Sequence, residues 1–211
     1  MKRTLLVAAL LAAVGAAQAS DLSFIVSSSA ARTETFNNIT GLPNFAPGTM
    51  VDLGSLWANK AGTITFTYLG QESGFTDSFH LVLNGTNLFE TDPVGSSISS
   101  WVGGPGLVDF KFEGISGKFA KNGGDLLNGL WDPGTSIGRI LPSTVSSGAA
   151  AGSYDLILGY NDSAGAATLG DWDDFVVGVK FTPVVPEPET YALMLAGLGV
   201  LGFLARRRRA D

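Results

Sequence analysis

Apolar residues in the central part of this 211-residue chain recur at every second position. The pattern is clearest where Ile64, Phe66 and Tyr68 alternate with threonines. The same alternation occurs in further segments, namely Leu22, Phe24, Val26; Phe110, Phe112; Tyr154, Leu156, Leu158; and Phe175, Val177, Val179, Phe181. Successive side chains of a β-strand point to opposite faces, so this period is typical of half-buried strands. No stretch of the body shows a long 3.6-residue period. The sequence therefore predicts an all-β body.

Glycine and proline interrupt the alternating segments at short intervals. Asn84 and Gly85 separate Phe79–Leu83 from Thr86–Glu90, and both tolerate positive φ, so we expect a hairpin with a two-residue turn. Short strands joined by such turns are typical of antiparallel sandwiches. We therefore expect one domain, an antiparallel β-sandwich or jelly roll, at residues 20–183. A segment of this length is enough to bury a core.

The first nineteen residues have the composition of a secretory signal peptide. Lys2 and Arg3 precede a twelve-residue apolar stretch, and small residues follow it. We expect a signal peptide at 1–19 that is cleaved between Ala19 and Ser20, and hence export of the chain. The absence of cysteine agrees with a chain that folds outside the cytosol without disulfides.

The C-terminal segment, residues 184–211, combines a proline break, an apolar stretch and a basic run. In order, these are Pro186, Glu187, Pro188; residues 190–205; and Arg206, Arg207, Arg208, Arg209. Proline fixes φ and removes a donor, so the break must be extended. The uncharged residues from Tyr191 would form about 22 Å of helix, which is shorter than the roughly 30 Å hydrocarbon core of a bilayer. The arginines can snorkel and stay on the cytoplasmic side. We therefore expect a transmembrane helix at 190–205.

This order of features resembles a PEP-CTERM sorting signal. The resemblance implies that Pro186, Glu187 and Pro188 are recognised by an exosortase, a membrane-embedded enzyme of Gram-negative bacteria that make exopolysaccharide. It also implies that the protein is anchored transiently in the inner membrane and then reaches the cell surface or the extracellular space. It covers only the C-terminal segment and implies nothing about the body.

The two terminal segments hold six of the 13 basic residues, so the body is more acidic than the whole chain, whose net charge is −6. An acidic domain repels nucleic acid and anionic polymers unless a divalent cation intervenes. We therefore expect no nucleic-acid partner. One histidine and no cysteine exclude zinc sites of the usual nitrogen and sulfur kind and thiol nucleophiles.

Acidic residues concentrate near the end of the body. Asp162 on one side and Asp171, Asp173 and Asp174 on the other flank a loop. Ca²⁺ takes six to eight oxygen ligands in tolerant geometry, although the spacing here is not that of an EF-hand. Two interpretations stay open: a polar loop capped by aspartates, and a Ca²⁺ site formed by these four carboxylates.

Three tryptophans are candidates for carbohydrate contact. Exposed indoles can stack on sugar rings, whereas buried indoles fill a core. Trp101 and Trp131 lie beside glycine and proline turns, and Trp172 lies among acids.

Together these features predict an exported, tail-sorted and non-catalytic matrix or adhesion protein that binds exopolysaccharide through Ca²⁺. One alternative is an extracellular carbohydrate-active hydrolase, which needs two acids in a groove. The only acids in a marked apolar setting, Asp109 and Glu113, would lie about 13 Å apart on one strand face. Another alternative is an inert structural envelope protein.

Overall fold

The computed structural model describes residues 20–32, 39–114, 117–124, 135–141, 143–162, 170–184 and 188–207. The predicted signal peptide at 1–19 lies outside these ranges. The strands are β1 Leu22–Ala31, β2 Met50–Ala58, β3 Gly62–Gly70, β4 Ser78–Leu81, β5 Thr86–Phe89, β6 Ser97–Val102, β7 Gly106–Leu107, β8 Phe110–Glu113, β9 Phe119–Lys121, β10 Ser136–Ile140, β11 Thr144–Val145, β12 Gly152–Ser153, β13 Leu156–Asn161 and β14 Phe175–Pro183. The helix is α2, Pro188–Arg207. The predicted all-β class is confirmed.

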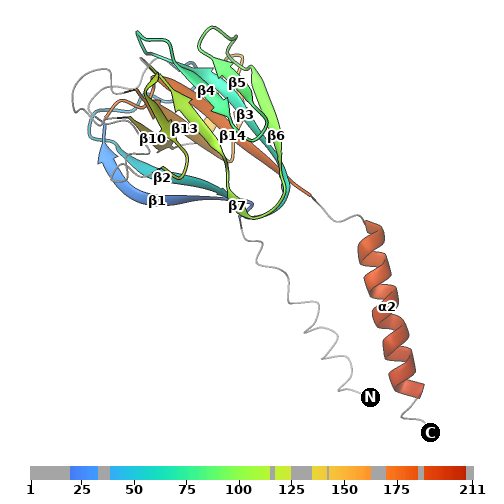
Figure 1. Cartoon of the computed structure of the whole chain (residues 1–211). Helices are drawn as coiled ribbons and strands as arrows, with labels where there is room; N and C mark the ends of the chain where they lie inside the picture. Colours follow the sequence, from blue (N-terminus) through green and yellow to red (C-terminus); the bar gives the residue numbers. More distant parts are fainter. Residues whose placement is uncertain are drawn as a thin grey trace.

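The strands form two main sheets. The larger has the order β1-β2-β10-β13-β14-β3-β6, with β7 also paired to β2, and the smaller has the order β5-β4-β8-β9. A third, two-stranded sheet joins β11 and β12. The pairings between described strands are antiparallel. Figure 1 shows β14 running through the larger sheet and leading toward α2.

Aromatic side chains fill the space between the two main sheets. Phe66 of β3 packs against Phe79 of β4 with ring centroids 4.6 Å apart, and Phe112 of β8 stacks on Tyr160 of β13 at 5.3 Å. All four side chains are fully buried, and burial of each apolar side chain stabilises the fold by about 1.5–3 kcal/mol. Most of the residues that the alternation places on one strand face thus join the sheets, but Val26 is exposed and Tyr154 packs against a different cluster.

The larger sheet is also covered on its outer face. Ile157 and Val176, which point away from the smaller sheet, belong to a second apolar cluster with Ile39, which precedes β2, and Val145 of the short strand β11. Every residue of β13 is therefore buried. Burial on both faces replaces the alternating pattern by a continuous apolar run.

The hairpin predicted around Asn84 is present, but its turn is longer than expected. Leu81 pairs with Thr86, so four residues, 82–85, connect β4 and β5. The N–H groups of Asn84 and Gly85 both donate to the carbonyl oxygen of Leu81, and Gly85 has a φ of 74°. Val82 and Leu83, which were expected in the strand, are exposed residues of this turn.

The turn between β2 and β3 holds both ends of the body. The backbone N–H of Asn59 donates to the carbonyl oxygen of Asp21 at 2.9 Å, and its side-chain amide donates to the carbonyl oxygen of Ser20 at 2.7 Å. The N–H of Val184 donates to the carbonyl oxygen of Ala61 at 3.0 Å. The chain therefore enters and leaves the body at one end of the sandwich.

Candidate functional site

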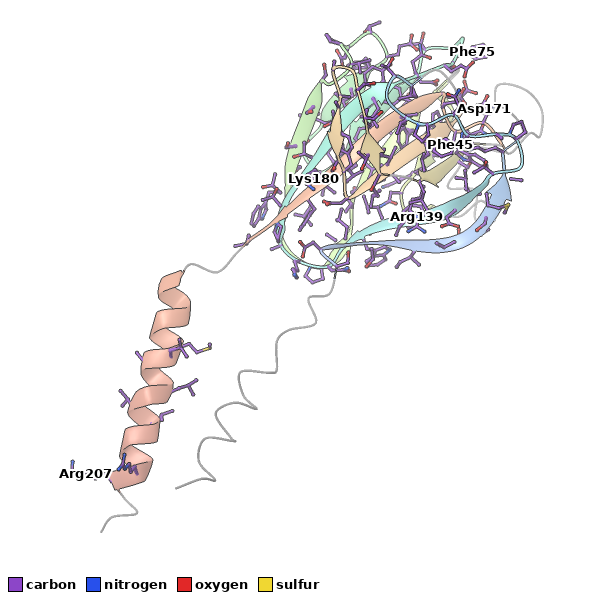
Figure 2. All side chains as sticks on the ribbon, turned by 180° about the vertical axis from the view of Figure 1, so that it is seen from behind. Phe45, Phe75, Arg139, Asp171, Lys180 and Arg207 are labelled. Carbon is purple, nitrogen blue, oxygen red and sulfur yellow. The ribbon has the colours of Figure 1, made fainter. Side chains whose placement is uncertain are left out.

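The aspartates predicted to bind Ca²⁺ lie at the other end of the sandwich. β14 begins directly after Asp174 and ends at Pro183, so its nine residues place these carboxylates about 30 Å from the exit of the chain. Figure 2 shows Asp171 at this end of the body and Lys180 nearer the exit. We name the acidic residues gathered there the acidic pole: Glu72, Asp77, Asp162, Asp171, Asp173 and Asp174.

Asp162 and Asp174 connect the end of β13 to the start of β14. The backbone N–H of Asp162 donates to Oδ2 of Asp174 at 2.7 Å, and the hydroxyl of Ser73 donates to Oδ2 of Asp162 at 3.1 Å. Both aspartates are buried. Asp174 therefore caps the chain where it leaves β13, which is the role that the interpretation without a metal assigns to these aspartates.

Asp77 joins these two residues from the segment before β4. Its side chain has no exposed surface, and neither carboxylate oxygen has a hydrogen-bond partner. A Cβ built on the neighbouring Gly114 would lie 2.5 Å from Oδ1 of Asp77, 3.1 Å from the hydroxyl of Tyr160 and 3.2 Å from Cβ of Asp162. Asp77 is not among the site residues predicted from the sequence, although it lies at the centre of the acidic pole.

Asp173 belongs to a second group, with Asp171 and Glu72. The backbone N–H of Glu72 donates to the carbonyl oxygen of Asp173 at 2.8 Å, and Oδ2 of Asp173 is buried without a partner. Burial lowers the pKa of Arg32, while the charges of Asp173 and Asp171 act to raise it. Arg32 is thus a cation that interacts with this second group.

Burial raises the pKa of three carboxyl groups at the acidic pole. The pKa of Asp77 rises to about 7, first through burial and then through the charge of Asp162. Burial raises the pKa of Asp174 to about 8, against the hydrogen bond from the backbone of Asp162. The pKa of Asp173 rises to about 9, through burial and then through the adjacent Asp171. These groups resist ionisation near neutral pH unless a cation offsets their charge.

The predicted calcium quartet is thus divided. Asp162 and Asp174 lie with Asp77, whereas Asp173 lies with Glu72, and the charge of Asp171 acts on both Asp173 and Asp174. In the described ranges, no three histidine, cysteine, aspartate or glutamate side chains are placed so that they could hold a metal ion as they stand. Calcium binding stays a prediction.

The tryptophans differ in their accessibility. Trp172 is fully buried, and its Nε1 donates to Oγ of Ser136 at 2.9 Å. This corrects the expectation of a carbohydrate contact at Trp172, because no face of its indole is open to a sugar ring. Trp101 lies on the edge strand β6 and is 57% exposed, so it stays a candidate stacking platform. Trp131 lies outside the described residues.

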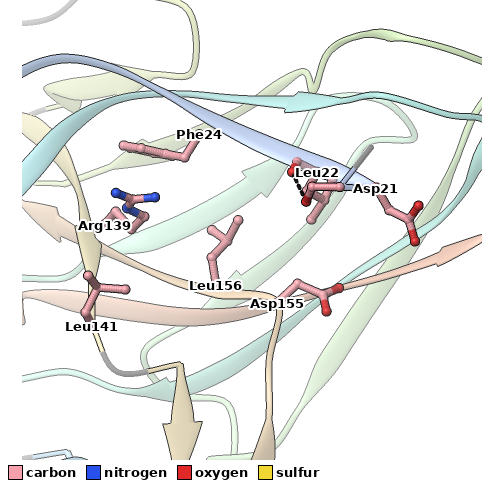
Figure 3. A pocket seen from close by; sticks show the side chains of 8 residues that line it. Asp21, Leu22, Phe24, Arg139, Leu141, Asp155 and Leu156 are labelled. Carbon is pink, nitrogen blue, oxygen red and sulfur yellow. Dashed lines mark hydrogen bonds between the residues drawn. The ribbon is translucent and has the colours of Figure 1, made fainter. Parts of the chain in front are cut away.

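A hollow of about 390 Å³ lies beside β1, β10 and β13 (Figure 3). The guanidinium of Arg139 lies 5.4 Å from the ring of Phe24. Asp21 and Asp155 are the acids that line this hollow, and each forms an ion pair with a lysine. Both acids that line the hollow are thus engaged in ion pairs.

The C-terminal apolar stretch is helical. α2 covers the predicted segment 190–205 and has Arg206 and Arg207 in its last turn. Its apolar side chains with a described exposure are open to solvent, among them Met194, Leu195, Leu198, Val200 and Leu201. Over the described part of the chain, no helix reaches the length and apolarity needed to cross a membrane. Pro186, Glu187, Arg208 and Arg209 lie outside the described residues, and Pro188 is the first residue of α2.

Comparison with known proteins identifies this C-terminal segment. The family described as the PEP-CTERM protein-sorting motif matches residues 184–209. Neither the curated proteins nor the solved structures contain a match to the chain. The matched motif implies processing by an exosortase, with export, membrane-associated sorting and delivery to the cell surface. The chain therefore carries a PEP-CTERM protein-sorting motif behind an all-β body.

Proposed function

We propose that the protein belongs to a Gram-negative envelope and is held at the inner membrane by its C-terminal helix until an exosortase processes the tail. It is then anchored at the cell surface or released. The matched motif is the observation that carries this proposal. The solvent-exposed leucine, valine and methionine side chains of α2 support it, because a helix with apolar residues all round needs an apolar environment.

Replacement of Glu187 tests the sorting step. Glu187→Ala should leave full-length protein in the inner membrane, whereas Thr190→Ala, just outside the Pro-Glu-Pro tripeptide, should be processed normally. Immunoblots of inner-membrane, surface and medium fractions measure the difference. Normal release of the Glu187→Ala variant would contradict processing at this motif.

For the body, we infer a non-catalytic module that binds exopolysaccharide. Ca²⁺ bridges the acidic pole to the anionic polymer, and Trp101 supplies a stacking surface. The position of the acidic pole supports this function, because it lies at the end of the body away from the tail. A tethered body would present that end to the surroundings, and a divalent cation would overcome the repulsion between carboxylates and an anionic polymer.

Cosedimentation with the host's exopolysaccharide tests this function. The full chain in detergent micelles should pellet with the polymer in calcium and stay in the supernatant in EDTA. Release of reducing sugars from the polymer would instead indicate the hydrolase alternative. If EDTA changed neither pelleting nor the melting temperature, the inert structural alternative would replace the calcium-dependent function.

A further inference from the structure

The two groups of the acidic pole differ in their counter-charge. Arg32 interacts with Asp173 and Asp171 of the second group. The charges that act on Asp77 and Asp174 are those of other carboxylates, and they disfavour ionisation. Removing an unpaired carboxylate from water costs several kcal/mol. The first group therefore has the greater need for an added cation.

We propose that Asp77, Asp162 and Asp174 form the binding site of one divalent cation with a preference for oxygen ligands, such as Ca²⁺. This inference rests on the calcium requirement of the proposed function, but it moves the site from the predicted quartet to a group centred on Asp77. This cation is held within the fold, where it joins the segment before β4 to the ends of β13 and β14, so it orders the acidic pole and is distinct from an ion that contacts the polymer.

Asp77 is the residue that points to a ligand. It has no exposed surface, and both of its oxygens lack a hydrogen-bond partner. Buried polar groups are nearly always satisfied, because each unsatisfied group costs about 1–3 kcal/mol and a charged group costs more. A cation bound by these oxygens would remove that cost.

Gly114 leaves room for such an ion. The position that its Cβ would occupy is close to Oδ1 of Asp77, to the hydroxyl of Tyr160 and to Cβ of Asp162, at 2.5, 3.1 and 3.2 Å. Any other residue at position 114 would therefore crowd Oδ1 of Asp77. Hard divalent cations select carboxylate oxygens such as those of Asp77.

Binding requires side-chain rotation, since the carboxylates do not form a closed ion cage as they stand. Asp77 can rotate because neither of its oxygens is held by a hydrogen bond of normal geometry, although the hydroxyl of Ser73 lies near enough to lower its pKa. Asp174 can keep Oδ2 on the backbone N–H of Asp162 and offer its other oxygen. Ca²⁺ tolerates irregular geometry and accepts water as a ligand, whereas Mg²⁺ demands a near-ideal octahedron.

Calcium titration of the full chain in detergent micelles tests the site. We expect saturable binding by calorimetry and a melting temperature about 5 °C or more above that in EDTA at a hundredfold excess over Kd. Asp77→Asn should abolish both effects. Asp173→Asn, which alters the second group, should leave the calcium affinity within about threefold of the wild-type value.

Two further measurements distinguish loss of the calcium site in Asp77→Asn from misfolding of this variant. In EDTA at pH 8, Asp77→Asn should melt at or above the wild-type temperature, because it removes a buried acid. Gly114→Ala, which keeps every carboxylate, should weaken calcium binding at least tenfold. Absence of saturable wild-type binding, or loss of binding in Asp173→Asn with retention in Asp77→Asn, would overturn the proposal.

The polysaccharide experiment distinguishes failure of the proposed function from failure of the cation site. Calcium binding that depends on Asp77 without pelleting of the polymer would support the cation site and contradict the proposed function. Calcium-dependent pelleting by Asp77→Asn, together with calcium affinity retained in calorimetry, would support the proposed function and contradict this site.

Discussion

The indole Nε1 of Trp172 donates a hydrogen bond of 2.9 Å to Oγ of Ser136, and both residues are fully buried. The indole lies against Gly138, which follows in β10, and the carbonyl oxygen of Trp172 lies against Gly159 in β13. Gly138 and Gly159 are cross-strand partners. Two side-chain-free positions in neighbouring strands therefore let the segment before β14 lie on the outer face of the sheet.

Gly159→Ala should destabilise the body by about 2–3 kcal/mol, because the new Cβ would overlap the carbonyl oxygen of Trp172 and the backbone would have to move. Thermal unfolding should show a melting temperature lower by about 4–12 °C. Gly152→Ala is a matched control, since a Cβ at this exposed position meets nothing within 4 Å. Equal melting temperatures for the two variants would contradict the close approach.

Asn122→Ala should cost about 3 kcal/mol or more of unfolding free energy. The side chain of Asn122 accepts from the N–H of Leu56 at 2.7 Å and donates to the carbonyl oxygens of Leu56 and Val108 at 2.8 and 2.7 Å. Its loss leaves buried backbone groups unsatisfied. Urea unfolding measures the effect, and Asn44→Ala at an exposed position should change stability by less than about 0.5 kcal/mol. An Asn122→Ala midpoint equal to that of the control would contradict this role.

In EDTA, stability should fall as pH rises from about 5 to 9. The pKa values of Asp77, Asp174 and Asp173 are about 7, 8 and 9 in the folded protein, above the usual 3.8 of an unfolded aspartate. The native state therefore binds more protons in this window, and the slope of unfolding free energy against pH is negative. Urea midpoints at pH 5, 7 and 9 measure it. Asp77→Asn should reduce the slope, whereas a rise in stability over this window would contradict the raised pKa values.

Trp101→Ala should weaken polysaccharide retention by about tenfold, which corresponds to 1.4 kcal/mol, without lowering the melting temperature. Its indole is 57% exposed on an edge strand, so its loss removes a stacking surface and little packing. Trp57→Ala, at a tryptophan that is 38% exposed, is the control for residue type and should retain affinity. Unchanged retention by Trp101→Ala would remove this residue from the binding surface.

The strands of the inner core could be predicted because apolar residues at every second position mark the face of a strand that is buried. In β3, Ile64, Phe66 and Tyr68 are all buried as the alternation requires. The outer cluster could not be predicted in this way. Ile39 and Val145 lie in one cluster with Ile157 of β13, and Ile39 comes from a segment more than a hundred positions away in the sequence.

The acidic pole was likewise predicted only where its residues are close in the sequence. Asp162 and Asp174 flank one loop, so their proximity follows from the antiparallel pairing of β13 and β14. Asp77 comes from a distant segment, yet it shares the phase of Phe79 and Leu81, which both face the core. An acid at a position that the alternation assigns to the buried face can be recognised from the sequence alone, and it indicates a buried polar group. Asn122 shows the same signal beside the buried Ala120.

The exit of the chain through β14 determines how the body would bear a mechanical load. β14 pairs with β13 over residues 175–179 and with β3 over residues 176–183, and its final residue leads directly into the tail. Inter-strand hydrogen bonds of an antiparallel sheet run perpendicular to the strands. A pull on the tail along β14 would therefore shear both ladders together instead of opening them one bond at a time, so the strand that tethers the body would also resist its extraction by flow.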